Sequence, residues 1–275
     1  MEYFNEVFAY EQVGRIKLLT ILETILGHRP TWKDLTDDNL LVLMKHLQQR
    51  YKMSTVQSFA CSLKTTIMRY SKYAVSKNYK TILNVNLGTE ARDKTFLTRH
   101  DMFLLENCET DDPYELESRT IFFIMAYTGA SYNDACSFTK DNINTEKGTL
   151  FYTTEKNGID ICIPAHENLL KFILAKTDIA TKSRNCLLNK KLKSLSEKAG
   201  LTDSDGEGHR KCDTIKFRTA QKTFATMMYH NGVPVEDIQK MMGLTIRMSA
   251  VNYIIGYVST RKNGKKQIQK VLNSL

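Results

Sequence analysis

Two long stretches of this 275-residue sequence contain no aspartate or glutamate. Residues 39–89 and 238–275 lack carboxylates altogether, although both stretches are rich in lysine and arginine. The whole chain has a formal net charge of +9 and a sequence pI near 9.1. Basic segments without intervening acids are typical of surfaces that bind a polyanion, so we expect a nucleic-acid partner.

Cysteine pairs and long apolar runs are also missing. The six cysteines show no CxxC spacing and are not accompanied by histidines, so no metal site is expected. Cys61 and Cys136 fall in apolar helical settings, which predicts reduced core residues. No apolar run reaches the ~20 residues that a membrane span needs, and the first residues do not resemble a secretory leader. We therefore expect a cytoplasmic protein without membrane contact.

The first third of the chain has the apolar spacing of helices. Apolar residues recur between positions 13 and 26, which predicts a helix over 10–26 that Gly27 terminates. Thr36, with Asn39 three residues later, predicts the start of a second helix that continues to about residue 51. A third helix is predicted from residue 54 or 55 to about residue 73. Together these segments predict a small helical bundle with basic faces.

The remainder of the chain mixes helices with one pair of strands. Residues 117–130 and 189–200 are predicted helices, and a last short one is predicted at 267–272. Residues 149–154 and 159–163 are rich in β-branched and aromatic side chains, which favours strands. The Asn157-Gly158 pair between them suits a primed hairpin turn. The predicted fold class is therefore mainly α with a small β-hairpin or sheet (α+β).

The most specific pattern lies in residues 217–253. Residues 223–226 read Thr-Phe-Ala-Thr, and residues 232–234 read Gly-Val-Pro, with the proline suited to the first turn of a helix. Gly243 follows that helix, and Tyr253 stands ten residues after the glycine. This arrangement resembles the end of the tyrosine site-specific recombinases, the phage-integrase family.

The resemblance assigns family positions to particular residues. In that family a His-x-x-Arg motif precedes Thr-Phe-Ala-Thr, a Gly-His pair ends the next helix, and the nucleophilic tyrosine follows. The first histidine position falls on Arg218, the arginine on Gln221 and the second histidine on Leu244. The tyrosine position is occupied by Tyr253.

Two upstream segments extend the resemblance to about residues 94–253. Residues 127–134 read Tyr-Thr-Gly-Ala-Ser-Tyr-Asn-Asp and resemble the family's Thr-Gly-x-Arg-x-x-Glu/Asp. Ser131 therefore takes the first arginine position, and Asp134 keeps the acidic one. The predicted hairpin matches the one that carries the family's catalytic lysine, which is Lys156 here.

The family reaction is a phosphoryl transfer without metal or other cofactor, so the resemblance implies none here. A tyrosine attacks a DNA phosphate and forms a 3′-phosphotyrosyl bond, arginines neutralise the non-bridging oxygens, and a lysine or histidine protonates the leaving oxygen. Ser131, Gln221 and Leu244 carry no charge, and losing one such electrostatic donor costs roughly a hundred- to a thousandfold in rate. We therefore expect an impaired site whose remaining catalytic candidates are Tyr253, Lys156 and Arg218.

The resemblance also implies domains and partners. It predicts a helical, SAM-like core-binding domain at 1–86, a linker at 87–96 and a tyrosine-recombinase catalytic-type domain with a C-terminal tail at 97–275. Expected partners are double-stranded DNA and, on it, either a homo-oligomer such as a tetramer or a hetero-assembly with an active recombinase. The expected setting is a mobile element or phage and the bacterial nucleoid. The candidate DNA-binding residues are Lys45, Arg50, Lys52, Lys64, Arg69, Lys72, Lys77 and Arg247.

Three functions remain open at this level. The first is a DNA-binding pseudo-recombinase that regulates, bridges or competes with an active enzyme. The second is a divergent but working recombinase, with Tyr253 as nucleophile, Lys156 as general acid and Arg218 as the main phosphate clamp. The third is a helical scaffold whose basic faces bind RNA, although no RNA-binding motif is recognisable.

Overall fold

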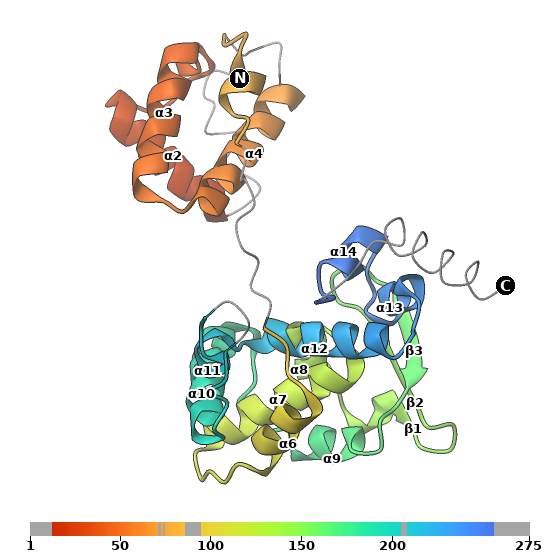
Figure 1. The fold of residues 1–275 in the computed structure, drawn as a ribbon. Helices are drawn as coiled ribbons and strands as arrows, with labels where there is room; N and C mark the ends of the chain where they lie inside the picture. The colour runs from red at the N-terminus through yellow and green to blue at the C-terminus, as the bar shows by residue number, and fades with distance from the viewer. Residues whose placement is uncertain (1–12, 71–72, 74, 86–94, 205–207, 256–275) are drawn as a thin grey trace, which may run out of the picture. The chain divides into compact units, whose positions relative to one another are not determined.

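The computed structural model describes residues 13–70, 73, 75–85, 95–204 and 208–255, and the chain divides into two compact units, unit 1 (1–92) and unit 2 (93–275) (Figure 1). Each unit has its own hydrophobic core. Lys72, the predicted helix at 267–272 and most of the expected linker lie outside the described residues.

Unit 1 consists of helices packed around leucine-rich faces. Thr36 caps α3 by accepting a hydrogen bond from the Asn39 backbone N–H at 3.2 Å, as predicted. The third helix ends at Arg69, four residues earlier than expected, and Tyr70 then packs against the buried Trp32 ring, with centroids 5.9 Å apart. The elements are α2 (Val13–Leu26), a 3₁₀ turn η1 (Trp32–Asp34), α3 (Asp37–Arg50), α4 (Met53–Arg69) and α5 (Tyr79–Ile82).

The prediction that Cys61 is a core residue is wrong. Its side chain is exposed on α4, because it lies one residue beyond Ala60, which is buried. Successive residues of a helix point about 100° apart, so a neighbour of a core position readily faces solvent. Cys136 is partly buried, and all six cysteines are free thiols.

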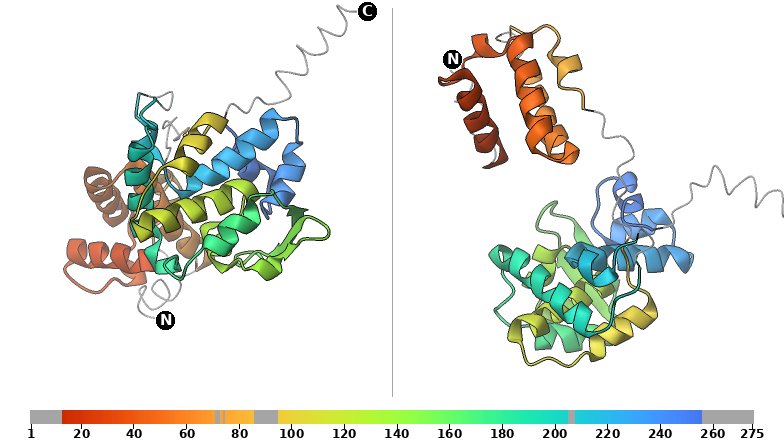
Figure 2. Two further views of the ribbon diagram at one scale, coloured as in Figure 1. Left: turned by 90° about the horizontal axis from the view of Figure 1, so that it is seen from below. Right: turned by 60° about the vertical axis from the view of Figure 1, so that its left-hand side comes forward.

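Unit 2 is built around two long helices, α7 (Pro113–Thr128) and α12 (Phe217–His230), which pack against each other. Helix α10 covers one side of α7, and the sheet and α13 lie toward the other side (Figures 1 and 2). Eleven of the sixteen residues of α7 are buried, so this helix is the centre of the core. The other helices include α6 (Arg99–Asn107), α8 (Tyr132–Ser137), α9 (Leu169–Ala175), α10 (Asn185–Lys198), α11 (Lys211–Thr214), α13 (Val235–Met241) and α14 (Arg247–Val251).

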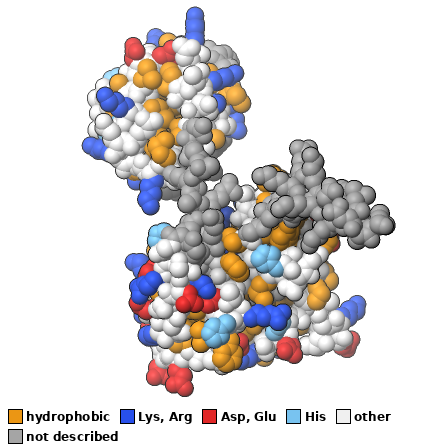
Figure 3. Space-filling view, in the orientation of Figure 1, with side chains coloured by type: hydrophobic (Ala, Val, Ile, Leu, Met, Phe, Trp, Pro, Cys, Tyr) orange, Lys and Arg blue, Asp and Glu red, His pale blue; other side chains and the backbone are white. Residues whose placement is uncertain are grey.

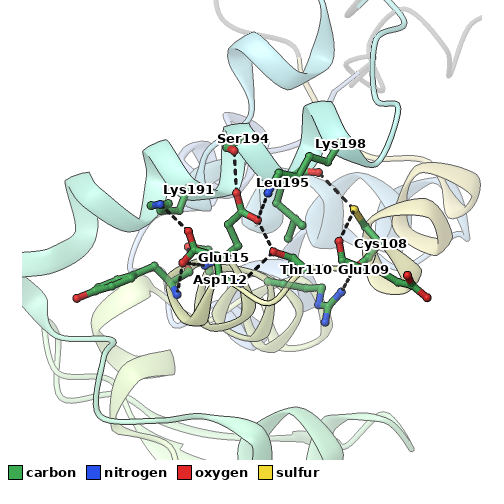
Figure 4. Close-up of polar contacts among 12 residues, drawn as sticks. Cys108, Glu109, Thr110, Asp112, Glu115, Lys191, Ser194, Leu195 and Lys198 are labelled. Atoms are coloured by element: carbon green, nitrogen blue, oxygen red, sulfur yellow. Dashed lines mark hydrogen bonds and ion pairs between the residues drawn. The ribbon is translucent and has the colours of Figure 1, made fainter.

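The start of α7 differs from the prediction for a local reason. The helix begins at Pro113, four residues before position 117, because the Asp112 side chain accepts hydrogen bonds from the Tyr114 and Glu115 backbones. Glu115 is buried and joins α7 to α10 through Lys198 (Figure 4). Helix α10 itself starts at Asn185, four residues before the predicted position.

The strands form a three-stranded antiparallel sheet, β1 (Ile143–Asn144), β2 (Thr149–Thr153) and β3 (Asp160–Pro164), in that order. Alternate residues of β2 and β3 are buried. The predicted hairpin is confirmed, but the two-residue primed turn is wrong. The loop contains four residues, 155–158, and only Gly158 has a positive φ, of 61°. A four-residue loop needs the left-handed conformation only at its last position, which the glycine supplies.

Candidate active site

A cavity of about 570 Å³ in unit 2 brings the predicted site residues together. They come from α8, the β2–β3 loop, α12, the turn after α13 and the segment after α14, which are far apart in the sequence. Arg218, about one helical turn before Gln221, is exposed and does not line the cavity itself, but contacts Tyr253, which does. The predicted positions that line the cavity are Ser131, Asp134, Lys156, Gln221, Leu244 and Tyr253.

Asp134 fixes the hairpin to the start of α8. Its Oδ1 accepts a hydrogen bond from the Glu155 backbone N–H at 2.9 Å, and its Oδ2 accepts one from the Ser131 hydroxyl at 2.7 Å. The Asp134 carboxylate is buried, so these bonds compensate the removal of its charge from water. The acidic position therefore serves to place the residue before Lys156.

The other side of the hairpin is held by the turn after α13. Asn157 Nδ2 donates to the Gly243 carbonyl oxygen at 3.1 Å. Gly243 has a φ of 62°, and a Cβ there would lie 2.5 Å from Thr154 Cγ2. Only glycine allows this close approach. Lys156 is exposed between the two anchored neighbours, so its backbone is fixed while its side chain retains reach.

The Thr-Phe-Ala-Thr run in α12 makes contacts that hold neighbouring segments of unit 2 in place. Thr223 accepts a hydrogen bond from the Leu97 backbone N–H at 2.9 Å. Phe224 packs against Gly129, where a Cβ would lie 2.6 Å from the ring. Thr226 accepts from the Ile255 N–H at 2.9 Å and donates to the Tyr253 carbonyl oxygen at 3.4 Å. The run therefore attaches α12 to the segment that carries Tyr253.

The substituted positions present neutral groups to the cleft. Gln221 Nε2 donates to the Gly129 carbonyl oxygen at 3.2 Å, so one of its amide hydrogens is already used. Ser131 is the N-cap of α8 and is bonded to Asp134. Leu244 is partly buried and packs with the small apolar cluster around α13 and α14. None of the three supplies a charge that would bind an anion.

Tyr253 and Arg218 contact each other directly. Tyr253 is partly buried, and the Arg218 guanidinium carbon lies 5.0 Å from the centroid of its ring, within the range of a cation–π interaction. Among the described residues, the Tyr253 hydroxyl has no hydrogen-bond partner. The phenol group at the cleft wall is therefore available to a bound molecule.

Two other tyrosines near the cleft are poorer candidates for a nucleophile. Burial, reinforced by nearby negative groups, raises the pKa of Tyr132, and its hydroxyl donates to the Thr181 carbonyl oxygen at 2.8 Å. Burial and then the charge of Asp134 raise the pKa of Tyr152, which points into the core. Both groups resist the loss of a proton more than an ordinary phenol does.

Two cleft residues were not anticipated from the sequence. Asn133 and Asn185 line the cavity, together with the predicted Gln221. Asn185 reaches it from the first residue of α10, more than fifty residues after Asn133 in the chain. No local motif marks either asparagine, because each owes its position to the packing of α8, α10 and α12.

The predicted DNA-binding residues differ in their exposure and in their ion pairs. Lys64 is partly buried, and Arg247 forms an ion pair with Glu236 at 2.5 Å. Lys and Arg side chains are spread over the visible face of unit 1, with few acidic ones (Figure 3). Within the described part of unit 1, no ion pair involves Lys45, Arg50, Lys52 or Lys77, and all four are exposed. The remaining two candidates are Arg69, which is exposed, and Lys72, which is not described.

Across the described ranges, no three His, Cys, Asp or Glu side chains gather as a metal ion would require. No described helix combines the length and apolarity that crossing a bilayer demands.

Comparisons with known proteins give one consistent result. The chain superposes on the Tn1549 transposon integrase in complex with transposon right-end DNA, with 12% identity, a TM-score of 0.71 and coverage of 98% of this chain and 97% of that one. It also superposes on lambda integrase in a tetramer bound to a Holliday junction, with 15% identity, a TM-score of 0.64 and coverage of 93% and 76%. A lambda integrase dimer bound to a COC′ core site gives 15% identity, a TM-score of 0.64 and coverage of 92% and 95%.

At these identities the superpositions establish the fold, which is mainly α with a small sheet. No functionally curated protein matches the sequence. The sequence profile of the phage integrase family matches residues 96–256, which is more than half of the chain. This protein therefore belongs to the phage integrase family, the tyrosine recombinases.

Proposed function

We propose that this protein binds duplex DNA in recombination or integration, holds a DNA phosphate in the cleft beside Tyr253, and forms the phosphotyrosyl bond slowly or not at all. The observation that carries this proposal is the chemistry of the substituted positions. Ser131, Gln221 and Leu244 all line the cleft that contains Tyr253, and all three are neutral. In this proposal the cleft keeps the candidate nucleophile but has no charged group at these three positions.

The rate argument follows from the charge that develops during phosphoryl transfer. A phosphodiester gains negative charge on its non-bridging oxygens, and cations at fixed positions stabilise it. Gln221 is bonded to Gly129 and brings no charge, and Ser131 is bonded to Asp134. Losing two such donors costs about ten-thousandfold or more in rate, although the separate losses do not add simply.

Binding to DNA rests on different features. Exposed cations on unit 1 and the net charge of +9 favour a polyanion. The Tn1549 integrase was solved with transposon right-end DNA, and lambda integrase was solved on DNA both as a tetramer and as a dimer. We extend this to the present chain as duplex binding in a homo-oligomer or together with an active recombinase.

An active but divergent recombinase is the second candidate, and one contact favours it. Arg218 lies against the Tyr253 ring, so its guanidinium needs to move only a short way to reach a phosphate that Tyr253 attacks. Lys156 lines the same cleft and has the chemistry of a general acid. In this alternative Arg218 replaces part of the missing charge.

A covalent-capture experiment separates the two candidates. The protein is incubated with a nicked duplex that carries its genomic target, mapped first by footprinting, so that cleavage releases a short strand and traps the adduct. We expect duplex binding and no adduct above the level of Tyr253→Phe. An adduct that forms with the natural chain and disappears in Tyr253→Phe would contradict the impaired-enzyme proposal and support the alternative.

Restoring the missing groups tests the stated cause of the impairment. Gln221→Arg combined with Leu244→His returns two family residues to the cleft. If charge loss limits the reaction, the double variant forms the adduct at least a hundredfold faster than the natural chain. A variant that binds DNA equally well and remains inert would show that the cause lies elsewhere.

A further inference from the structure

The cleft contains an amide donor that neither the family motif nor the catalytic candidates account for. Asn185 is the first residue of α10 and lines the cavity. Its side chain is partly buried, so it is neither a free surface group nor a core residue. Its orientation decides what it offers to a bound molecule.

A short relay of hydrogen bonds fixes that orientation. The Phe217 backbone N–H, at the first residue of α12, donates to Asn189 Oδ1 at 2.8 Å. Asn189 Nδ2 in turn donates to Asn185 Oδ1 at 2.8 Å. Because Asn185 Oδ1 is used as an acceptor, its Nδ2 is the end that remains for the cleft. Among the described residues, no group accepts a hydrogen bond from Asn185 Nδ2.

The segment that leads into α10 is also fixed. The Tyr132 hydroxyl donates to the Thr181 carbonyl oxygen at 2.8 Å, which attaches this segment to α8. A 3₁₀ turn η4 (Lys182–Arg184) then enters α10 directly. The N-cap, Arg184, makes no side-chain capping bond. The partial positive charge at the start of α10 therefore receives no side-chain cap from Arg184, and it adds to the attraction of an anion near Asn185.

We propose that Asn185 is a phosphate-positioning residue, whose pre-oriented amide donates to a non-bridging oxygen of the DNA phosphate held in the cleft. This inference rests on the proposed function of the cleft. A fixed neutral donor compensates part of the binding lost at Gln221 without replacing the charge that cleavage requires. It accounts for a site that retains a phosphate and yet activates it poorly.

The side-chain amide of Asn157, in the same cleft, is a matched control for Asn185. Asn157 also lines the cavity, but its Nδ2 already donates to the Gly243 carbonyl oxygen at 3.1 Å. Asn157 and Asn185 thus both line the cavity with a side-chain amide. The Asn157 Nδ2 donor is already used, whereas the Asn185 Nδ2 donor is not. Only the second is expected to respond to a phosphate diester.

The test uses the full chain, labelled with ¹⁵N, and dimethyl phosphate as the probe, with the neutral trimethyl phosphate as its uncharged counterpart. The side-chain amide signals of Asn185 are assigned by their loss in Asn185→Ala. We expect dimethyl phosphate to shift the Asn185 amide and the Tyr253 ring signals, to leave the Asn157 amide nearly unchanged, and to do so more strongly than trimethyl phosphate.

Three variants then measure the contribution. Asn185→Ala should weaken dimethyl phosphate binding about three- to tenfold, the effect of one hydrogen bond. Asn185→Asp keeps the acceptor for Asn189 but puts a negative charge in the cleft, so it should weaken binding further. Asn189→Leu leaves Asn185 in place but removes the bond that orients its amide, together with the acceptor for the Phe217 N–H, and should produce a loss similar to that of Asn185→Ala.

The outcomes distinguish this inference from the proposed function. If the Tyr253 signals shift while Asn185 is silent, or if Asn185→Ala binds as well as the natural chain, the role of Asn185 is refuted and the phosphate cleft stands. If no cleft signal responds to dimethyl phosphate, the proposed phosphate site itself fails, and the role of Asn185 fails with it.

Discussion

The guanidinium carbon of Arg218 lies 5.0 Å from the centre of the Tyr253 ring, so the charged group nearest to the candidate nucleophile rests on its aromatic face. At an exposed site a cation–π contact is worth about 0.5–1 kcal/mol, whereas a hydrogen bond to a charged group is worth about 1.5–3 kcal/mol. If the cleft binds a DNA phosphate as proposed, we expect that phosphate to compete with the Tyr253 ring for Arg218.

The first prediction follows from that competition. Arg218→Ala should weaken duplex binding and reduce the slope of log K against log salt by about 0.9, the value for one phosphate contact. Arg218→Lys should retain the slope. Filter binding or fluorescence anisotropy over a series of salt concentrations measures both. The control is Lys171→Ala, which removes the same charge from an exposed residue paired with Glu106. Equal slopes for all three variants would show that Arg218 does not reach DNA.

The second prediction concerns the attachment of Tyr253 to α12. Thr226→Val removes a fully buried hydroxyl that accepts from the Ile255 N–H and donates to the Tyr253 carbonyl oxygen. Leaving that N–H without a partner should cost about 1–3 kcal/mol of unfolding free energy. Thr226→Ser retains the hydroxyl and should recover most of the loss, which urea denaturation measures. A valine variant as stable as the natural chain would rule out this role.

The family could be predicted from the sequence because its motifs depend on local spacing. Thr-Phe-Ala-Thr has a fixed register on one helix, and the distance from Gly243 to Tyr253 is set by a short turn and the five-residue α14. Thr223, Phe224 and Thr226 each contact a different segment of unit 2. The helix capped by Thr36 was predictable for the same local reason.

Features that depend on tertiary packing could not be predicted from the sequence. Asn185 reaches the cleft only because α10 packs beside α7 and because Asn189 bonds to the start of α12. The exposure of Cys61 depends on which side of α4 faces its neighbours. The stacking of Arg218 on Tyr253 joins residues on different elements, and no sequence pattern encodes it.

The third prediction is a dependence of stability on pH through Glu115. Burial opposes ionisation of this carboxyl, but hydrogen bonds from Lys198, Thr110 and Ser194 outweigh it and hold its pKa below the ordinary value of 4.5. The stabilisation is therefore fully present above about pH 5 and is lost as the pH falls through the lowered pKa of the folded state.

Glu115→Gln tests that dependence. At pH 7 it should lower the unfolding free energy by about 1–3 kcal/mol, because the charge-assisted bonds are lost. The difference from the natural chain should shrink as the pH falls below 4.5. Urea denaturation at a series of pH values measures it. Glu109→Gln removes the same charge from an exposed position in the adjoining loop and should have little effect at any pH. A difference that is constant with pH would contradict the assignment.

The fourth prediction separates two costs at Gly129, which ends α7 with a φ of 71°. Gly129→Ala places a left-handed backbone on alanine, at about 1–2 kcal/mol, and also drives a Cβ to 2.6 Å from the buried Phe224 ring. Gly200 has a φ of 79° with nothing within 4 Å of its Cβ position, so Gly200→Ala carries the backbone cost alone. The Gly129 variant should therefore be less stable than the Gly200 variant by about 1–3 kcal/mol.

Because Phe224 precedes the residues that attach Tyr253 to α12, displacing its ring should also weaken duplex binding. If urea denaturation gives the same loss of unfolding free energy for both alanine variants, the Phe224 ring moves aside without an energetic penalty. Its contact with Gly129 then does not maintain the structure of the cleft.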